Sequence, residues 1–250
     1  MPSLLLSLLG LVLPALATGE QVLLYDLSLD GQRVGTRHVT LRSLQAEDGG
    51  EVRVIESYTE LEASIAGQTL DFANRATARV ETATTSFTSS VSEGGQVREV
   101  QARQRSDGTW KVTVIEGSEV KQATLPRGQV DLSSMQLLDP VAHRELTARA
   151  RASVLAVETG TLFSGLVEDL GEGQIELSDG AVSVHRWAWS PSSLRMELAW
   201  SQDGVLVAYD SQVLGRTVQA RLRQVPAARS YGDIELVAPV IDQGLAEQEL

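Results

Sequence analysis

Residues 194–204 read LRMELAWSQDG, and this short run contains the pattern from which the fold class can be predicted. Apolar side chains occupy every second position from Leu194 onward, while polar or charged side chains take most of the positions between them. Because successive side chains of a strand point to opposite faces of a sheet, this alternation predicts one buried and one solvated face. The closing Asp203-Gly204 pair is typical of a tight hairpin turn. Residues 217–223, TVQARLR, alternate in the same way and predict a second such strand.

Turn signals recur along the chain at similar intervals. Asp-Gly pairs supply the positive φ angles of a tight hairpin. The pairs are Asp30-Gly31, Asp48-Gly49, Asp107-Gly108, Asp179-Gly180 and Asp203-Gly204. Further glycine turns are predicted at Ala66-Gly67, Glu93-Gly94-Gly95 and Glu172-Gly173. Short turns join strands that pair with each other, so the chain is expected to be all-β, an antiparallel meander of roughly twelve or more strands. A sheet of that size favours a barrel or a strongly curled half-barrel.

The alternating pattern breaks at residues 126–151. Asp139-Pro140 combines a helix N-cap residue with proline at the first helical position, and residues 141–148 then follow a helical pattern. Asp131 is a candidate cap for a shorter helical turn just before them. We therefore expect a short helical crossover at about residues 131–150 that plugs or covers one end of the barrel. A linker between two β subdomains is the alternative, although the Gly/Ser/Pro-rich composition of a domain boundary is missing.

Composition narrows the classes of protein that the chain can belong to. It has 250 residues, 42% of them hydrophobic, no cysteine and a formal net charge of -12. That length suits one domain with a buried core. The missing cysteine excludes thiolate zinc sites, iron–sulfur clusters, cysteine nucleophiles and a lipid-modified cysteine. The acidic balance argues against general binding to nucleic acid, since phosphate affinity depends on clustered Lys and Arg.

The N-terminus has the features of a signal peptide. A leucine-rich run from Leu4 to Leu16 precedes the first charged side chain, Glu20, and is shorter than the roughly 20 apolar residues that cross a bilayer. Ala15-Leu16-Ala17 fits an A-x-A cleavage site, so residues 1–17 are expected to be removed. A buried N-terminal strand or an uncleaved anchor is the alternative, because no Lys or Arg precedes the apolar run. The sequence predicts no transmembrane span after this segment.

Residue usage points to a bacterial exported protein, either periplasmic or secreted. Export without cysteine fits that setting better than small eukaryotic extracellular domains, which depend on disulfides. Arginine fills all basic positions except Lys111 and Lys121, which suggests a GC-rich genome. We expect the mature chain to form one β-barrel-like domain at residues 18–230, followed by an acidic tail at residues 231–250.

No catalytic or metal-binding motif is visible in the sequence. His38, His143 and His185 lack a second histidine or a carboxylate at a spacing that metal sites use, so we interpret them as surface or capping residues. The nucleophile motif G-x-S-x-G and the glycine-rich phosphate-binding loops are also missing. No pair of carboxylates can be singled out for acid–base chemistry. We therefore expect a non-catalytic protein with no metal and no cofactor.

Arginines gather locally at three places in this acidic chain. They are Arg98, Arg103 and Arg105; Arg144, Arg149 and Arg151; and Arg216, Arg221, Arg223 and Arg229. In one interpretation they pair with acidic side chains across the solvated face of the sheet. In the other they form a rim that holds a carboxylate or phosphate group.

Tryptophans gather near the C-terminal end. Trp187, Trp189 and Trp200 fall within a short segment, with Trp187 and Trp189 on one face of a predicted strand. They either pack in the core or form the wall of an apolar ligand cavity. Trp187, Met196 and Trp200 are therefore the candidate ligand-binding residues.

Several segments resemble a known family. Residues 25–35, YDLSLDGQRVG, look like the opening hairpin of an uncharacterised family of exported bacterial β-barrel domains, a domain of unknown function. Residues 201–207, SQDGVLV, with residues 213–217, VLGRT, are similar to its D-G-x-L-V…G closing segment. Related domains precede transglutaminase-like catalytic domains, and their Leu-x-Asp-Pro stretch resembles residues 137–140. The resemblance implies a periplasmic, non-catalytic module and assigns no functional residue.

Three functional hypotheses follow. The first is a binding or carrier module whose apolar interior accepts a lipid-like or other hydrophobic small molecule. The second is a structural or assembly protein of the cell envelope that contacts another envelope protein through its sheet edges or outer face. An enzyme is the third, which a cluster of polar residues at the barrel mouth would support. The sequence does not indicate the oligomeric state.

Overall fold

Antiparallel strands dominate the structure, a computed structural model that describes residues 17–46, 49–65, 68–178, 180–192, 194–213 and 216–223. The first meander consists of β1 (Ala17–Leu29), β2 (Gln32–Gln45), β3 (Glu51–Ile65), β4 (Gln68–Val80), β5 (Thr85–Glu93), β6 (Gln96–Gln104), β7 (Trp110–Glu116) and β8 (Glu119–Leu125). The crossover contains β9 (Leu132–Ser133), the 3₁₀ helix η1 (Ser134–Leu138) and α1 (Ala142–Thr147). The second meander consists of β10 (Arg151–Leu155), β11 (Leu162–Leu177), β12 (Gly180–Pro191), β13 (Arg195–Ser201), β14 (Leu206–Val213) and β15 (Arg216–Leu222).

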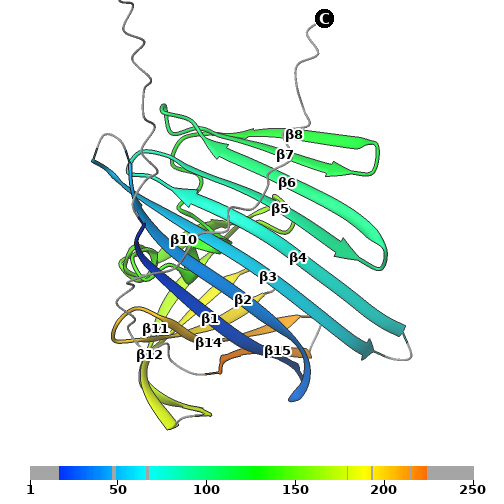
Figure 1. Cartoon of the computed structure of the whole chain (residues 1–250), viewed down its shortest axis with the longest axis vertical. Coiled ribbons are helices and arrows are strands. Elements are labelled where there is room, and N and C mark those ends of the chain that lie inside the picture. Colours follow the sequence, from blue (N-terminus) through cyan, green and yellow to red (C-terminus); the bar gives the residue numbers. More distant parts are fainter. Residues whose placement is uncertain are drawn as a thin grey trace, which may run out of the picture.

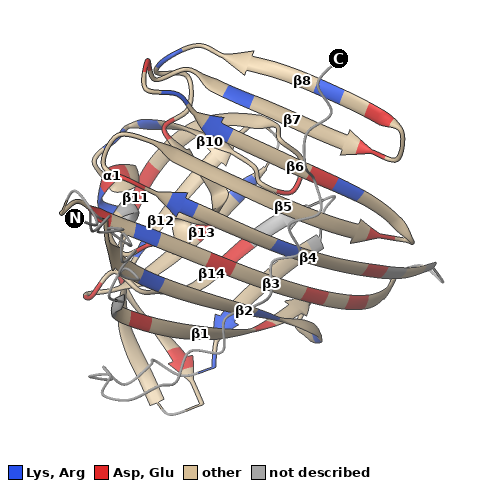
Figure 2. Cartoon of the chain, turned by 45° about the horizontal axis from the view of Figure 1, so that its top comes forward, with Lys and Arg blue, Asp and Glu red and all other residues tan. Residues whose placement is uncertain are grey.

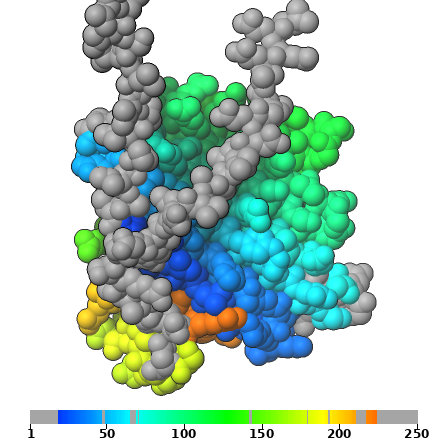
Figure 3. Space-filling view, in the orientation of Figure 1, coloured from blue at the N-terminus to red at the C-terminus, as the bar shows by residue number. Residues whose placement is uncertain are grey.

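The strands of the described residues form one 15-stranded sheet in which β8 and β9 are the two edges. The two meanders are joined where the last strand pairs with the first, since β15 lies antiparallel to β1. Figure 3 shows this junction, with β15 in orange directly beside β1 in dark blue. Backbone pairing between β8 and β9 would close a barrel, but the described sheet is open there. The predicted all-β meander is confirmed in its half-barrel form (Figure 1).

Side chains bring the two ends of the curled sheet together although the backbone does not. The loop between β10 and β11 packs against the inner face of β6 and β7. A Cβ added to Gly160 of this loop would lie 2.8 Å from Val114 Cγ2 and 3.3 Å from Val100 Cγ1. A single core cluster accordingly contains buried residues of both meanders and of the crossover. An open sheet of this many strands covers its apolar face by curling on itself.

The alternation read from the sequence corresponds to this inner face. Leu198 and Trp200 of β13 and Ala220 and Leu222 of β15 are each at most 2% exposed. The predicted hairpin at Asp30-Gly31 is confirmed, with φ of 49° and 83° in the two turn residues. Residues 48, 66, 67 and 179, which belong to three other predicted turns, lie outside the described residues.

One turn prediction was wrong. Glu172-Gly173 lies within the long strand β11, which continues to Leu177 before the chain turns. The pairing with β12 shifts register between Asp169 and Gly171, and Gly171 has a φ of 78°. Glycines in a strand also mark bulges, so a cluster of them in the sequence does not by itself indicate a turn.

The helical crossover is confirmed, but its caps differ from the prediction. Helix α1 begins two residues later than expected, with Val141 at its N-cap. Asp139 accepts the backbone N–H of Val141 at 2.9 Å and forms an ion pair with Arg53. Asp131 caps no helix and instead accepts the backbone N–H of Ser153 at 2.8 Å. The backbone N–H of Ser133 donates to the Gln136 side chain at 2.8 Å at the start of η1.

The crossover fills one end of the curled sheet. Met135 and Leu138 of η1 and Leu146 of α1 are at most 1% exposed, and η1 packs against β3 and β4. Figure 1 shows these short helices in green at the end of the sheet beside β10. The segment therefore plugs this end, as the sequence indicated. The predicted signal peptide, apart from Ala17, and the predicted acidic tail lie outside the described residues.

Candidate functional site

The interior of the curled sheet contains a cavity of about 300 Å³. Its apolar wall comes from the plug and from the second meander. The wall includes Leu138 of η1, Val154 of β10, Trp189 of β12, Met196 and Leu198 of β13, and Leu206 of β14. Phe163 of β11 also lines the cavity and is 37% exposed, so the cavity extends to the protein surface. We call this space the interior cavity.

One charged side chain, Arg37 of β2, reaches the interior cavity from the first meander. Its guanidinium donates from Nε to Ser57 Oγ at 2.9 Å and from Nη1 to the Tyr209 hydroxyl at 3.3 Å. Nη2 lies 3.9 Å from Met135 Sδ, a weak acceptor. Burial acts to lower the pKa of Arg37, but Tyr209 and Glu158 raise it and the net change is upward. The guanidinium of Arg37 is therefore charged, and its three hydrogen-bond partners are neutral.

Two tyrosines position the polar end of the interior cavity. The Tyr25 hydroxyl donates to the Leu206 carbonyl oxygen at 2.7 Å, and burial raises the pKa of this phenol. The rings of Tyr25 and Tyr209 lie 6.4 Å apart at a tilt of 50°. The Tyr25 hydroxyl bonds to the backbone of β14. The Tyr209 hydroxyl accepts a hydrogen bond from Arg37, so its own O–H group can donate to a further acceptor.

Glu158 is the carboxylate that lines the interior cavity. Ser134, at the start of η1, donates from Oγ to Glu158 Oε2 at 3.4 Å. Ser134 Oγ also accepts the backbone N–H of Val157 at 3.1 Å, which ties the β10–β11 loop to the plug. Among the described residues Glu158 forms no ion pair within 4.0 Å of Arg37. Its charge acts on Arg37 only from a distance.

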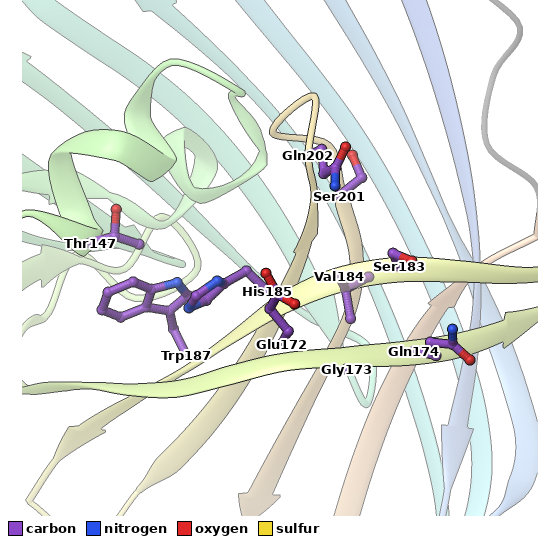
Figure 4. A pocket seen from close by; sticks show the side chains of 10 residues that line it. All are labelled: Thr147, Glu172, Gly173, Gln174, Ser183, Val184, His185, Trp187, Ser201 and Gln202. Carbon is purple, nitrogen blue, oxygen red and sulfur yellow. The ribbon is translucent and has the colours of Figure 1, made fainter.

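A second, more polar pocket of about 620 Å³ lies between β11, β12 and the end of β13. Figure 4 shows the side chains that line this pocket, with the rings of His185 and Trp187 stacked. Thr147 of α1 also lines the pocket. The ring centres of His185 and Trp187 are 5.4 Å apart. His185 Nε2 lies 2.6 Å from Asp169 Oδ1, and this contact is the main reason that the pKa of Asp169 is lowered. We call this second pocket the surface pocket.

The three predicted ligand-binding residues fall in different places. Met196 lines the interior cavity, and Trp187 lines the surface pocket. Trp200 is 1% exposed and packs within the core. Their role in ligand binding stays a prediction. Sequence reasoning missed Arg37, although a signal was present: Arg37 falls in the same alternation phase as the buried Val39, where an apolar side chain is expected.

Four of the clustered arginines pair with acidic side chains, and Arg98 and Arg221 do so across neighbouring strands, as one interpretation proposed. Arg98 pairs with Glu116, Arg149 with Asp131, Arg221 with Asp210, and Arg223 with Asp26. Figure 2 shows basic and acidic residues interspersed along the strands of the first meander. The side chain of Arg216, residue Arg229 and the side chain of His143 lie outside what the structure describes.

The described residues contain no group of three or more His, Asp or Glu side chains that could hold a metal ion. Within the same part of the chain, no helix combines the length and the hydropathy needed to cross a membrane.

Comparison with known proteins yields a likeness of fold. No protein-family model matches the chain, and a comparison with curated proteins finds no match. A solved structure, the beta-barrel-like protein of domain of unknown function DUF1849 from Brucella abortus, superposes with a TM-score of 0.55 and 10% sequence identity. The alignment covers 80% of this chain and 94% of that chain.

At this identity the likeness shows the fold alone. The resemblance to an uncharacterised bacterial β-barrel domain family is confirmed at that level. The link to transglutaminase-like domains stays a prediction.

Proposed function

We propose that this protein is a non-catalytic β-barrel-like module that binds, and in the periplasm or outside the cell carries, a hydrophobic small molecule in its interior cavity. The observation that carries the proposal is the cavity itself. Protein interiors are close-packed, with few voids larger than a water molecule. A space of about 300 Å³ walled by Trp189, Met196 and Leu198 is far larger, and it lies at the lower end of the range of small-molecule sites.

The position of the interior cavity supports the interpretation that it is a ligand-binding site and not a packing defect. It lies between the plug and the second meander, and Arg37 of the first meander also lines it. Partial exposure of Phe163 gives a route for entry and release. Ligand sites in β-barrel folds commonly occupy this place. Export is proposed from the signal-like segment at residues 1–17 and from the missing cysteine.

A cavity-filling substitution tests this proposal. Ala156 lines the interior cavity, so Ala156→Leu would occupy part of it. The matched control is Ala123→Leu on β8, where the side chain is exposed. Titration with Nile red, an uncharged hydrophobic dye, should show saturable binding to the natural protein and to Ala123→Leu. We expect the affinity of Ala156→Leu to fall by about tenfold, equivalent to about 1.4 kcal/mol. Failure of the natural protein to take up dye, or equal binding by Ala156→Leu, would contradict the proposal.

The open edge of the sheet favours a second candidate function, assembly with an envelope protein. Strand β8 ends the described sheet, and Val120 on it is 57% exposed. An unpaired edge can add a strand from a partner. Cross-linking in an envelope fraction tests this: Val120→Glu should abolish a partner cross-link while leaving dye binding intact. An unchanged cross-link would argue against the edge.

A further inference from the structure

The guanidinium of Arg37 has spare hydrogen-bonding capacity in an apolar space. A guanidinium carries five N–H donors. Ser57, Tyr209 and Met135 account for three of them, and the sulfur of Met135 is a poor acceptor. The remaining donors belong to the terminal nitrogens of a side chain that lines the interior cavity. A partly buried donor without an acceptor is destabilising, and more so when it is charged.

Other partly buried arginines in the described part of the chain pair with a carboxylate. Arg53 pairs with Asp139, Arg221 with Asp210 and Arg223 with Asp26. Arg37 has no carboxylate within 4.0 Å among the described residues. An arginine with a purely structural role could have been paired with a carboxylate in the same way. The missing carboxylate therefore indicates that an anion from a bound ligand pairs with Arg37.

The surroundings define the shape of that anion. A guanidinium matches the two oxygens of a carboxylate in a bidentate arrangement. The Tyr209 hydroxyl, which accepts from Arg37, can donate its proton to the same group. The negative charge of Glu158 stands elsewhere on the cavity wall, bonded to Ser134. It disfavours a second anionic group, so the ligand should carry one negative charge.

Apart from Arg37, Tyr209, Glu158 and Ser134, the side chains that line the interior cavity are apolar, and the cavity is small. Val154, Trp189 and Leu198 offer no polar side-chain group to the cavity, because the indole N–H of Trp189 donates to the Ala152 carbonyl oxygen at 3.1 Å. One charged end and one apolar body describe a single-chain amphiphile. A space of about 300 Å³ suits a chain of medium length better than a two-chain lipid.

We propose that the interior cavity binds a single-chain amphiphile with a carboxylate head group, and that Arg37 and Tyr209 hold the carboxylate. This inference rests on the proposed function, since it names the class of ligand for the same cavity.

Calorimetric titration with decanoate, decanol and decyl phosphate tests the inference, because the three probes share a chain and differ in the head group. The natural protein should bind decanoate about tenfold or more tightly than decanol, since hydrogen bonds between charged groups are stronger than those to a neutral hydroxyl. Arg37→Met should lose this preference while it still binds decanol and Nile red. Arg98→Met, which removes an arginine paired with Glu116 on the β6–β7 hairpin, is the matched control and should behave like the natural protein.

Each contrary outcome has its own meaning. Equal binding of decanol and decanoate, or undiminished decanoate binding by Arg37→Met, would overturn the inference and leave the proposed function intact. Tighter binding of decyl phosphate than of decanoate would overturn the carboxylate assignment. Failure of all three chains and of Nile red to bind would remove both proposals.

A second measurement covers the case in which Arg37→Met does not fold. Decanoate with an isotope-labelled carboxyl carbon is titrated by NMR while bound to the natural protein. The Arg37 cation should keep the bound carboxylate ionised at a pH at which free decanoate is already protonated. A bound carboxyl group that titrates like the free acid would overturn the inference.

Discussion

Single buried hydrogen bonds position the cavity, and the bond of Tyr25 is the clearest case. Its hydroxyl bonds to the Leu206 carbonyl oxygen across the β1–β14 interior, with Tyr25 fully buried. We expect Tyr25→Phe to lower the free energy of unfolding by about 1–2 kcal/mol, because it leaves a buried carbonyl without its donor. Urea denaturation measures this. Tyr58→Phe is the control: Tyr58 bonds to the exposed Glu60 at the surface, and its loss should not change stability measurably. Equal effects in the two variants would contradict this role for Tyr25.

The pair formed by Asp169 and His185 gives an expectation about pH. The hydrogen bond from His185, helped by the backbone N–H of Gly171, lowers the pKa of Asp169. A lowered folded-state pKa stabilises the fold above the usual Asp value of about 3.9, and this contribution is lost as pH falls through the lowered pKa. In an NMR titration the Asp169 carboxyl should therefore titrate below the usual range, and His185→Ala should raise its pKa.

Asp107 provides an internal control in the same spectra. Its pKa is lowered by the hydroxyl and backbone N–H of Thr109, far along the chain from His185. The Asp107 titration should be unchanged by His185→Ala. An Asp169 pKa that also stays unchanged would show that the contact with His185 does not stabilise the carboxylate.

At the scale of elements, the strands with one solvated face could be predicted from the sequence. Helix ends and bulges that depend on contacts with other strands could not. Alternation identified the inner faces of β13 and β15, since it depends only on neighbouring residues. The N-cap was predicted at Asp139 but lies at Val141. Asp139 still accepts the backbone N–H of Val141, and its other carboxylate oxygen pairs with Arg53 of β3, a residue far away in the sequence that no local pattern indicates. Glu172-Gly173 was predicted as a turn because a local signal does not distinguish a bulge from a hairpin.

The β2–β3 hairpin depends on one glycine for close approach. A Cβ at Gly35 would overlap the carbonyl oxygen of Glu60 on the neighbouring strand. We expect Gly35→Ala to destabilise the protein by about 1–3 kcal/mol, as overpacked positions do, and to lower Tm by roughly 2–4 °C per kcal/mol. Gly19→Ala on β1, where nothing lies within 4 Å of the added Cβ, should leave Tm unchanged. Calorimetry compares the two variants, and an unchanged Tm in Gly35→Ala would contradict the close approach.

The ion pair between Asp139 and Arg53 attaches the plug to the sheet. Asp139 is 4% exposed, so Asp139→Ala leaves a partly buried cation without its partner. We expect a loss of about 3 kcal/mol in the free energy of unfolding, with faster hydrogen exchange in residues 134–147. Glu81→Ala, which breaks the exposed pair with Arg79, should have no resolvable effect. If exchange in the plug were unaffected by Asp139→Ala, another contact would have to hold it.

At the scale of the whole molecule, curling brings residues from distant strands to one cavity. Arg37 of β2, Tyr209 of β14 and Met135 of η1 meet only because β15 pairs with β1 and the plug enters the open end. The sequence indicated an apolar interior with Met196 in it, but the strand order, the open seam and the role of Arg37 depend on pairings between distant residues. No local pattern contains those pairings.

The measurement that tests ligand binding in the interior cavity most directly is an NMR titration of the isotope-labelled protein with decanoate, with every shifted backbone amide mapped on the fold. We expect the largest shifts at residues that line the interior cavity, such as Val154, Leu198 and Tyr209. Residues of the surface pocket such as Glu172 and Gln174, and residues of β8, should shift little. Shifts confined to the surface pocket, or no saturable shift at all, would contradict ligand binding in the interior cavity.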